Sequence, residues 1–198
     1  MDTSIISGIQ IYNAFLAGYH NISQYRERIN QINVFPVPDG DTGNNMVRTF
    51  GTIIKNLEKS KSAGKVLDNL AELSLSGARG NSGIIMSQYL NGVSRVAGDC
   101  ETCTFSEFGK AVKEAVKDAY TAVEQPEDGT ILTVIHAWAE TIFNESMHRI
   151  SVSELFSRGY KTARIHLERT TEQLQVLKKN KVVDAGAWGF VCFLEGID

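Results

Sequence analysis

Hydrophobic residues recur at three- and four-residue steps along most of this chain. The first such stripe consists of Ile5, Ile9, Tyr12, Leu16 and Tyr19. Similar stripes run through residues 46–57, 66–73, 84–93, 108–123, 132–143 and 155–167. This spacing is that of amphipathic helices, and no segment alternates with period two for long enough to predict a strand. The pattern therefore predicts an all-α protein of roughly eight helices.

Helix start signals agree with this pattern. Thr104 with Glu107, and Ser151 with Glu154, have the spacing of capping boxes at helix N-termini. The chain has only three prolines, Pro36, Pro38 and Pro126, so long helices can run without interruption.

Composition narrows the class of protein. The chain has 198 residues, of which 42% are hydrophobic and 22% charged, and we expect one globular domain over residues 1–198. A net charge of -3 provides no basic field for a nucleic acid. No apolar run approaches the roughly 20 residues of a membrane-spanning helix, and the first residues lack the basic start and cleavage site of a signal peptide. We therefore expect a cytoplasmic protein.

The cysteines and histidines carry little chemistry. Cys100 and Cys103 have the spacing of a metal or redox pair, but a structural zinc site needs two more ligands and the only other cysteine is Cys192. The histidines are isolated, and His136 is expected in the core or at its rim.

Polar and small residues gather instead in four connections between the predicted helices. These connections are Asn33–Met46 (NVFPVPDGDTGNNM), Ser76–Gly83 (SGARGNSG), Pro126–Thr130 (PEDGT) and Val182–Gly189 (VVDAGAWG). Loops held on a rigid helical scaffold are common places for functional residues.

The first connection has the composition of a cation site. Asp39 and Asp41 flank Gly40, so both carboxylates can face one hard cation such as Mg²⁺ or Ca²⁺. A calcium EF-hand is excluded, because its sixth and twelfth positions, glycine and glutamate, are here Asn44 and Phe50. The segment then opens a helix, whose free N–H groups attract anions. The pattern suits a magnesium–phosphate complex, and an ordinary turn with two solvated aspartates is the alternative.

The second connection also leads into a helix. Its glycines allow close backbone approach, and Asn81 and Ser82 add side-chain donors. It is neither a P-loop nor a dinucleotide-binding motif, and a tight helix–helix turn is its structural alternative. The remaining two connections, with Gly129-Thr130 and Asp184-Ala185-Gly186, could each be a simple helix cap.

Taken together, the motifs PVPDGDTG, GARGNSG, EDGT and VVDAGAWG resemble the DhaL-type (DAK2) nucleotide-binding domain. This domain is shared by dihydroxyacetone kinases and the catalytic subunit of bacterial fatty acid kinases. The resemblance implies an antiparallel eight-helix barrel that holds ATP or ADP and two Mg²⁺ ions in loops at one rim. It implies that Asp39 and Asp41 are the metal ligands and catalytic residues, with Asn33 near the place of a third ligand. It further implies nucleotide contacts from Thr42, Gly43, Asn44, Asn45, Gly80, Asn81, Ser82, Gly129, Thr130, Ile131, Asp184 and Gly186.

The sequence differs from the dihydroxyacetone kinase pattern at one position that bears on the acceptor substrate. Those kinases have a histidine after the second aspartate, where this chain has Thr42. The chain is thus more similar to the fatty acid kinase branch, which implies transfer of the γ-phosphate to a fatty acyl carboxylate. A dihydroxyacetone-type kinase subunit and a nucleotide-binding regulatory module without turnover are the alternatives. In the fourth connection Ala187 and Trp188 replace a common glycine, which leaves the contacts of that loop open.

The same resemblance implies a longer protein and a partner. Fatty acid kinase subunits carry further domains after this one and act on an acyl-binding protein of the DegV-like type. We therefore expect the chain to be the N-terminal part of such a kinase, with dimerisation, if any, through the other domains.

Overall fold

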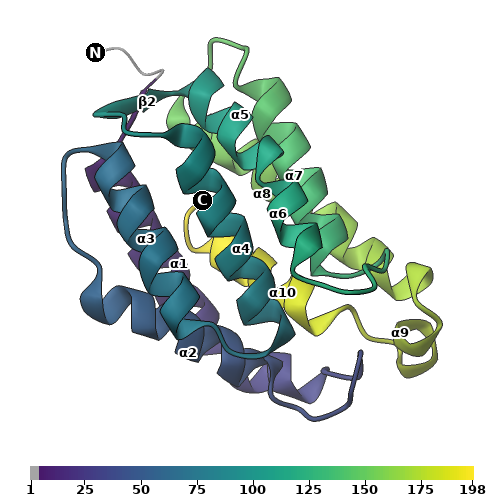
Figure 1. The fold of residues 1–198 in the computed structure, drawn as a ribbon. Coiled ribbons are helices and arrows are strands. Elements are labelled where there is room, and N and C mark those ends of the chain that lie inside the picture. Colours follow the sequence, from purple (N-terminus) through teal and green to yellow (C-terminus); the bar gives the residue numbers. More distant parts are fainter. Residues whose placement is uncertain (1–4) are drawn as a thin grey trace.

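The computed structural model of the chain describes residues 5–198 as a bundle of ten helices and one pair of very short strands (Figure 1). The elements are β1 (Ile5–Ser7), α1 (Gly8–Gln31), α2 (Thr42–Asn56), α3 (Ala63–Gly77), α4 (Gly80–Ala97), β2 (Thr102–Thr104), α5 (Phe105–Glu114), α6 (Val116–Thr121), α7 (Ile131–Glu145), α8 (Val152–Gln173), α9 (Gln175–Asn180) and α10 (Ala185–Glu195). The all-helical fold class is confirmed. The eight helices of ten residues or more match the expected number, and α6 and α9 are additional short ones.

The long helices pack in chain order. Each of α1 to α5 contacts the next, α5 contacts α7, α7 contacts α8, and α10 lies against both α8 and α1. Short connections between successive helices make neighbours run in opposite directions. Contact between the first and last long helices is what the expected barrel requires, and closure of a barrel itself stays a prediction.

The two strands correct the sequence reading. Ile5 was expected on a helical stripe, but it lies in β1, which pairs antiparallel with β2 so that Ile6 is opposite Cys103. Both of these residues are buried, while their neighbours along each strand are at least partly exposed. Three residues are too few to produce a recognisable period-two pattern, which explains why no strand was predicted.

The stripe over residues 108–123 was also expected as one helix, and the structure breaks it at Ala115. Gly92 of α4 packs against this break, because a Cβ on Gly92 would lie only 2.9 Å from the Cβ of Ala115. The break lets both α5 and α6 contact α4. Periodicity alone does not reveal such an interruption, since the apolar positions continue in phase through it.

The predicted caps are present, one of them in part. Thr104 and Glu107 form a complete capping box, and the hydrogen bonds from Thr104 lower the pKa of Glu107. The Ser151 hydroxyl accepts a hydrogen bond from the Glu154 N–H at 3.1 Å. The Glu154 carboxylate does not complete that box, because it pairs with Arg158 instead. A further capping box joins Ser7 and Gln10 at the start of α1, where the Ser-x-x-Gln spacing was available in the sequence.

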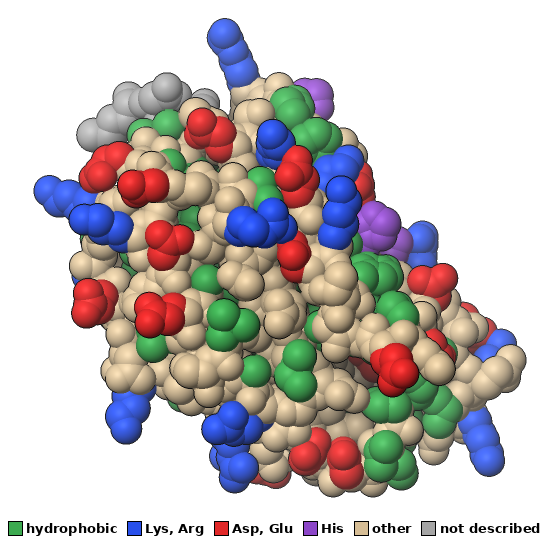
Figure 2. Space-filling model, viewed as in Figure 1, with side chains coloured by type: hydrophobic (Ala, Val, Ile, Leu, Met, Phe, Trp, Pro, Cys, Tyr) green, Lys and Arg blue, Asp and Glu red, His purple; other side chains and the backbone are tan. Residues whose placement is uncertain are grey.

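The interior and the surface follow the expected polarity. Apolar side chains from α1, α3, α4, α5, α7, α8 and α10 surround an internal cavity of about 470 Å³. The indole N–H of Trp138 lies at its wall, buried and without a hydrogen-bond partner among residues 5–198. On the face seen in Figure 2, acidic and basic side chains are interspersed without a large patch of one sign. Within residues 5–198, no helix has both the length and the apolar character to cross a membrane.

Candidate functional site

Four helix N-termini meet at one end of the bundle around a cavity of about 660 Å³. The cavity wall includes the first residues of α2 and α4 and the cap residues of α7 and α10. In Figure 1 these helix starts and the α6–α7 connection gather at the lower right, away from the strand pair. A helix N-terminus carries a partial positive charge, so the convergence of four of them favours an anion.

Asp39 and Asp41 both line this cavity. Gly40 between them has a φ of 66°, in the left-handed region that glycine adopts without strain. Asp41 occupies the N-cap position of α2, yet its side chain makes no capping hydrogen bond within the described part of the chain. Its carboxylate is therefore available to a ligand.

Asn33 lines the same cavity as Asp39 and Asp41, and its side chain also makes hydrogen bonds within the aspartate loop. Its side-chain oxygen accepts hydrogen bonds from the Asp41 N–H (3.3 Å), the Thr42 N–H (3.0 Å) and the Thr42 hydroxyl (2.6 Å). Its amide group donates to the carbonyl oxygens of Phe35 and Val37. Asn33 is only 5% exposed. Asn33 thus braces the aspartate loop in this structure, with both lone pairs of its side-chain oxygen engaged, and its place as a third metal ligand stays a prediction.

The first turn of α2 divides between the cavity and α1. Thr42 and Asn45 line the cavity. Gly43 is buried against the Arg26 carbonyl of α1, where a Cβ would collide. The Asn44 N–H donates to the side-chain oxygen of Asn30 at 3.1 Å. Gly43 and Asn44 therefore hold α2 on α1, and neither belongs to the described cavity wall.

The connection between α3 and α4 supplies the part of the wall that lies next to α2. Gly80, Asn81 and Ser82 all line the cavity, as the sequence predicted. Gly80 has a φ of 62°, and a Cβ there would lie 2.5 Å from the side-chain nitrogen of Asn45. Arg79, the N-cap residue of α4, makes no side-chain cap bond among the residues that the structure describes. The first turn of α4 is thus open toward the cavity.

The third and fourth connections contribute capped helices. Thr130 and Ile131 line the cavity, and the Thr130 hydroxyl caps α7. Gly129 does not line it in the described structure. Its φ is 84°, and its N–H donates to the Thr133 hydroxyl at 2.9 Å, so Gly129 shapes the turn before α7.

Asp184 is the most strongly perturbed acid of the site. It lines the cavity, is 5% exposed and caps α10 by accepting a hydrogen bond from the Ala187 N–H at 2.8 Å. Burial raises its pKa to about 6, against the opposing effect of hydrogen bonds from the backbone N–H groups of Ala187 and Ile131. Gly186 lies close to α4, because a Cβ there would be 2.6 Å from the Ser82 hydroxyl. The fourth connection therefore ties α10 to both α7 and α4.

Several wall residues were not predicted from the sequence. The segment that follows α6 contributes Ala122, Val123, Glu124 and Gln125, and the next connection contributes Glu127. Glu127 lies in a connection already singled out, but residues 122–125 carry no motif. Phe35, Pro36 and Val37 belong to the first connection, and Ile85 and Leu132 follow the predicted residues along α4 and α7. Their place could be known only from the packing of the helices.

The charged side chains in the cavity wall are all acidic. Asp39, Asp41, Glu124, Glu127 and Asp184 line the cavity, whereas none of its described wall residues is Lys, Arg or His. Within residues 5–198, no group of three or more His, Cys, Asp or Glu side chains is arranged to hold a metal by itself. A cation bound at Asp39 and Asp41 therefore needs ligands from another molecule or from water.

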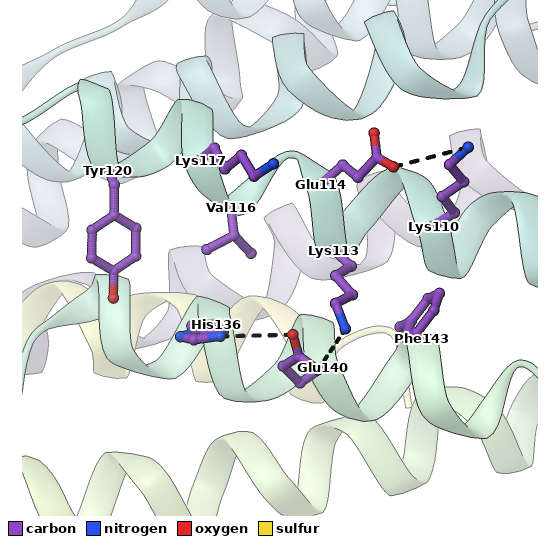
Figure 3. A pocket seen from close by; sticks show the side chains of 9 residues that line it. All are labelled: Lys110, Lys113, Glu114, Val116, Lys117, Tyr120, His136, Glu140 and Phe143. Atoms are coloured by element: carbon purple, nitrogen blue, oxygen red, sulfur yellow. Dashed lines mark hydrogen bonds and ion pairs between the residues drawn. The ribbon is translucent and has the colours of Figure 1, made fainter.

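A second groove, of about 830 Å³, lies on the outside between α5, α6 and α7 (Figure 3). Lys113 reaches over the ring of Phe143 at 4.2 Å and pairs with Glu140 at 3.0 Å. His136 also faces Glu140, at 3.8 Å, and it is exposed in this outer groove rather than in the core or at its rim as expected. This groove contains none of the motif residues, and most of its charges are paired with one another, so it is not the predicted site.

The cysteines also lie outside the site. Cys100, Cys103 and Cys192 are all free thiols. Burial and the neighbouring Cys100 raise the pKa of Cys103, which keeps it protonated and unreactive. Among the described residues, no group of three or more His, Cys, Asp or Glu side chains that could hold a metal ion surrounds this pair.

Comparison with known proteins identifies the family of the chain. The DAK2 domain matches residues 36–198. The chain belongs to the DAK2 domain family. In Mycoplasma pneumoniae the MG369 homolog is 41% identical to this DAK2 domain over 189 residues, which cover 91% of the chain and 34% of that protein. Protein YloV of Bacillus subtilis is 37% identical over 198 residues, which cover 99% of the chain and 36% of that protein. The DAK2 domain studied here thus spans about a third of the length of these relatives.

The fold has a counterpart among solved structures. The crystal structure of the native dihydroxyacetone kinase of C. freundii matches 94% of this DAK2 domain with a TM-score of 0.70, at 14% sequence identity, and 33% of that chain is covered. The DhaL-type resemblance and the all-helical fold are confirmed. Family and fold are those of a kinase-related domain.

Proposed function

We propose that this domain binds Mg²⁺–ATP in the cavity at the four helix N-termini, with the metal at Asp39 and Asp41, and that it belongs to a kinase. The observation that carries the proposal is the convergence of α2, α4, α7 and α10 on one cavity with two carboxylates at its edge. The cavity volume of about 660 Å³ suits a nucleotide. Family membership supports this assignment.

The charge of the wall favours a metal complex over the bare nucleotide. Five carboxyl groups without a cationic side chain in the described wall would repel a triphosphate. Asp39 and Asp41 would each give an oxygen to Mg²⁺, which prefers one or two carboxylates together with phosphate oxygens and water. When bound, the metal neutralises charge on the transferring phosphoryl group. We expect two ions, as the resemblance implies.

The two kinds of helix start suggest an orientation for the nucleotide. At the start of α4 the N-cap residue Arg79 makes no side-chain capping bond in residues 5–198, so this end suits phosphate oxygens. At the start of α2 the Thr42 and Asn44 N–H groups already donate to Asn33 and Asn30, so α2 offers the side chains of Thr42 and Asn45 instead. By contrast, α7 and α10 are capped by Thr130 and Asp184. Near them lie the apolar side chains of Val123, Ile131 and Leu132, which suit the base. On this basis Thr42, Asn45 and Gly80–Ser82 hold phosphates, and the α7 and α10 ends border the nucleoside.

The acceptor that we propose is a fatty acyl carboxylate. Thr42 follows the aspartate pair, and no histidine lies in the described cavity wall that could hold or deprotonate a hydroxyl acceptor. A carboxylate acceptor has no proton to lose, so positioning and charge neutralisation suffice. A dihydroxyacetone-type acceptor is favoured by one observation only, the fold shared with dihydroxyacetone kinase.

The remainder of the protein and its partners follow from the same proposal. The chain spans about a third of its relatives, and we propose that it is the N-terminal domain of a cytoplasmic kinase whose other domains mediate any dimerisation. The acyl group would be presented by a DegV-like acyl-binding protein. We propose no role in nucleic-acid binding.

The decisive experiment is a calorimetric titration of the chain with ATP in the presence and absence of Mg²⁺. We expect binding that depends on Mg²⁺ and is lost with EDTA. Transfer of labelled phosphate in the presence of an acyl-binding protein separates a kinase from a regulatory module. Absence of any Mg²⁺-dependent nucleotide binding would contradict the proposal.

A further inference from the structure

Thr49 joins the two loop segments that form the phosphate side of the cavity. It lies on α2, one turn after Asn45, and is 0% exposed. Its hydroxyl donates a hydrogen bond to the Asn45 carbonyl oxygen at 2.8 Å and accepts one from the Arg79 backbone N–H at 3.1 Å. Because Arg79 directly precedes Gly80, this single hydroxyl connects α2 to the start of α4.

The glycines of the second connection fit against the same face of α2. A Cβ on Gly83 would lie 2.6 Å from the Thr49 hydroxyl oxygen, and a Cβ on Gly77 would lie 2.9 Å from the Cβ of Thr52. These two glycines are buried and do not line the described cavity. Their small size thus lets the α3–α4 connection approach α2 closely enough for the Thr49 hydrogen bond.

We propose that Thr49 is a positioning residue for the nucleotide phosphates. Its hydroxyl fixes the Arg79 backbone, and through it the direction of the N–H groups at Gly80, Asn81 and Ser82. This inference rests on the proposed function, since it concerns the same cavity. Thr49 does not line the cavity in the described structure, so it acts through the loop rather than by touching the ligand.

The chemistry requires a hydroxyl at this position. A group that both donates and accepts in one place is supplied by Thr or Ser, whereas Val has the same shape and neither capacity. In a Thr49→Val variant the part-buried Arg79 N–H loses its acceptor, so we expect the loop to move toward another partner. A shift of about 1 Å in the first turn of α4 misplaces the phosphate-binding N–H groups.

Thr52 provides a matched control. It lies on the same helix, three residues further on, and also packs against Gly77. Its hydroxyl donates to the Arg48 carbonyl oxygen of its own helix, at 3.0 Å, and this bond does not reach the α3–α4 connection. Thr52→Val therefore makes the same chemical change on α2 without releasing the loop.

The experiment compares the wild-type chain with T49V, T49S and T52V. Calorimetry gives the Kd for Mg²⁺–ATP and for adenosine, and NMR hydrogen exchange reports the Arg79 N–H without any ligand. We expect T49V to weaken Mg²⁺–ATP about tenfold, to change adenosine less than twofold and to exchange the Arg79 amide faster. We expect T49S to restore all three values, and T52V to leave them unchanged.

The alternative outcomes are distinct. Equal weakening of both ligands by T49V, or an unchanged Arg79 exchange rate, would overturn the positioning role. An unchanged Kd for Mg²⁺–ATP in T49V, with normal binding by the wild type, would overturn it as well. Failure of the wild-type chain to bind Mg²⁺–ATP would instead refute the proposed function, and the positioning role with it, even where the exchange data confirm the hydrogen bond.

Discussion

The backbone N–H of Asp184 donates a hydrogen bond to the hydroxyl of Thr170 at 3.0 Å, and both residues are buried. This bond joins the end of α8 to the start of α10 at the wall of the cavity. The Asp184 carboxylate then accepts hydrogen bonds from N–H groups at the starts of α10 and α7. One acid thus fastens three helices at the site, and its protonation should be visible in the stability of the protein.

The pH dependence of stability should carry the signature of Asp184. Its pKa is raised from 3.8 to about 6 in the folded protein, so the folded state binds a proton more tightly than the unfolded chain. The resulting stabilisation is fully present below about pH 3.8 and is lost as the pH rises through about 6. Between pH 4 and 7, we expect the free energy of unfolding of Asp184→Asn to rise relative to wild type by about 2 kcal/mol. Urea unfolding at several pH values measures this difference, and parallel profiles would exclude it.

Removing the charge of the aspartate pair should abolish metal-dependent binding. Asp39→Asn and Asp41→Asn keep the size of the side chain but remove the charge that attracts Mg²⁺. We expect loss of Mg²⁺-dependent ATP binding in calorimetry with an unchanged melting temperature. Asp128→Asn is the control, since Asp128 is exposed and is not one of the described wall residues. Unchanged Mg²⁺–ATP affinity in both site variants would disprove the metal assignment.

The hydrogen bonds of Asn33 predict that its removal lowers the stability of the fold more than the affinity for Mg²⁺–ATP. Asn33→Ala leaves the N–H groups of Asp41 and Thr42 without their acceptor and should destabilise the fold by about 1–3 kcal/mol. Mg²⁺–ATP affinity should fall only in part, because both carboxylates remain. Chemical unfolding and calorimetry on the same preparation test this pair of effects. Complete loss of metal binding with unchanged stability would indicate that Asn33 is a direct ligand.

Alanine variants of Gly80 and Gly98 can separate the effect of backbone strain from an effect on nucleotide binding. Both have positive φ, at 62° and 67°, so an alanine at either position costs roughly 1–2 kcal/mol. Gly80 lines the cavity and faces Asn45, whereas a Cβ on Gly98 would meet nothing within 4 Å. We expect Gly80→Ala to weaken ATP more than adenosine, and Gly98→Ala to change neither affinity. Equal weakening of ATP and adenosine by Gly80→Ala would indicate a folding defect instead.

The helices and the four connections were predictable because both depend on local sequence. The spacing of apolar residues predicts a helix wherever one face is buried. Glycines such as Gly40 and Gly80 indicate the turns that precede helices. Since these motif turns precede α2, α4, α7 and α10, their meeting at one end follows once the topology is known. The expectation that these loops lie at one end of the bundle came from the family resemblance and not from the spacing of apolar residues.

Other features depend on contacts between distant residues. The brace at Asn33 and the hydroxyl bridge at Thr49 involve partners up to 30 residues away, and the sequence does not show which groups these side chains contact. The wall residues 122–125 are similar, since only the packing of α6 beside α7 brings them to the cavity. The strand pair β1–β2 is too short for a periodic signal. Tertiary contacts decide such positions, and one sequence does not encode them locally.

The final prediction concerns the acceptor. The cavity at the helix N-termini accounts for one substrate, and the separate apolar cavity shares no described wall residue with it. Transfer requires the acceptor oxygen in line with the γ-phosphate and water excluded, which an open rim does not provide without a docked partner. We therefore expect the 198-residue chain to bind Mg²⁺–ATP and to phosphorylate free fatty acid negligibly.

Activity should appear only when an acyl-carrying protein and the further kinase domains are added together. The measurement is transfer of labelled phosphate from ATP to a fatty acid, with the chain alone, with each addition and with both. Asp39→Asn in the complete system is the control, because it should remove transfer while leaving acyl binding by the partner unchanged. Robust turnover by the chain alone would mean that the acceptor site lies among its own helices. In that case the pocket beside Trp138 would be the first place to look, since most of its wall is apolar and the buried indole N–H of Trp138 has no hydrogen-bond partner in residues 5–198.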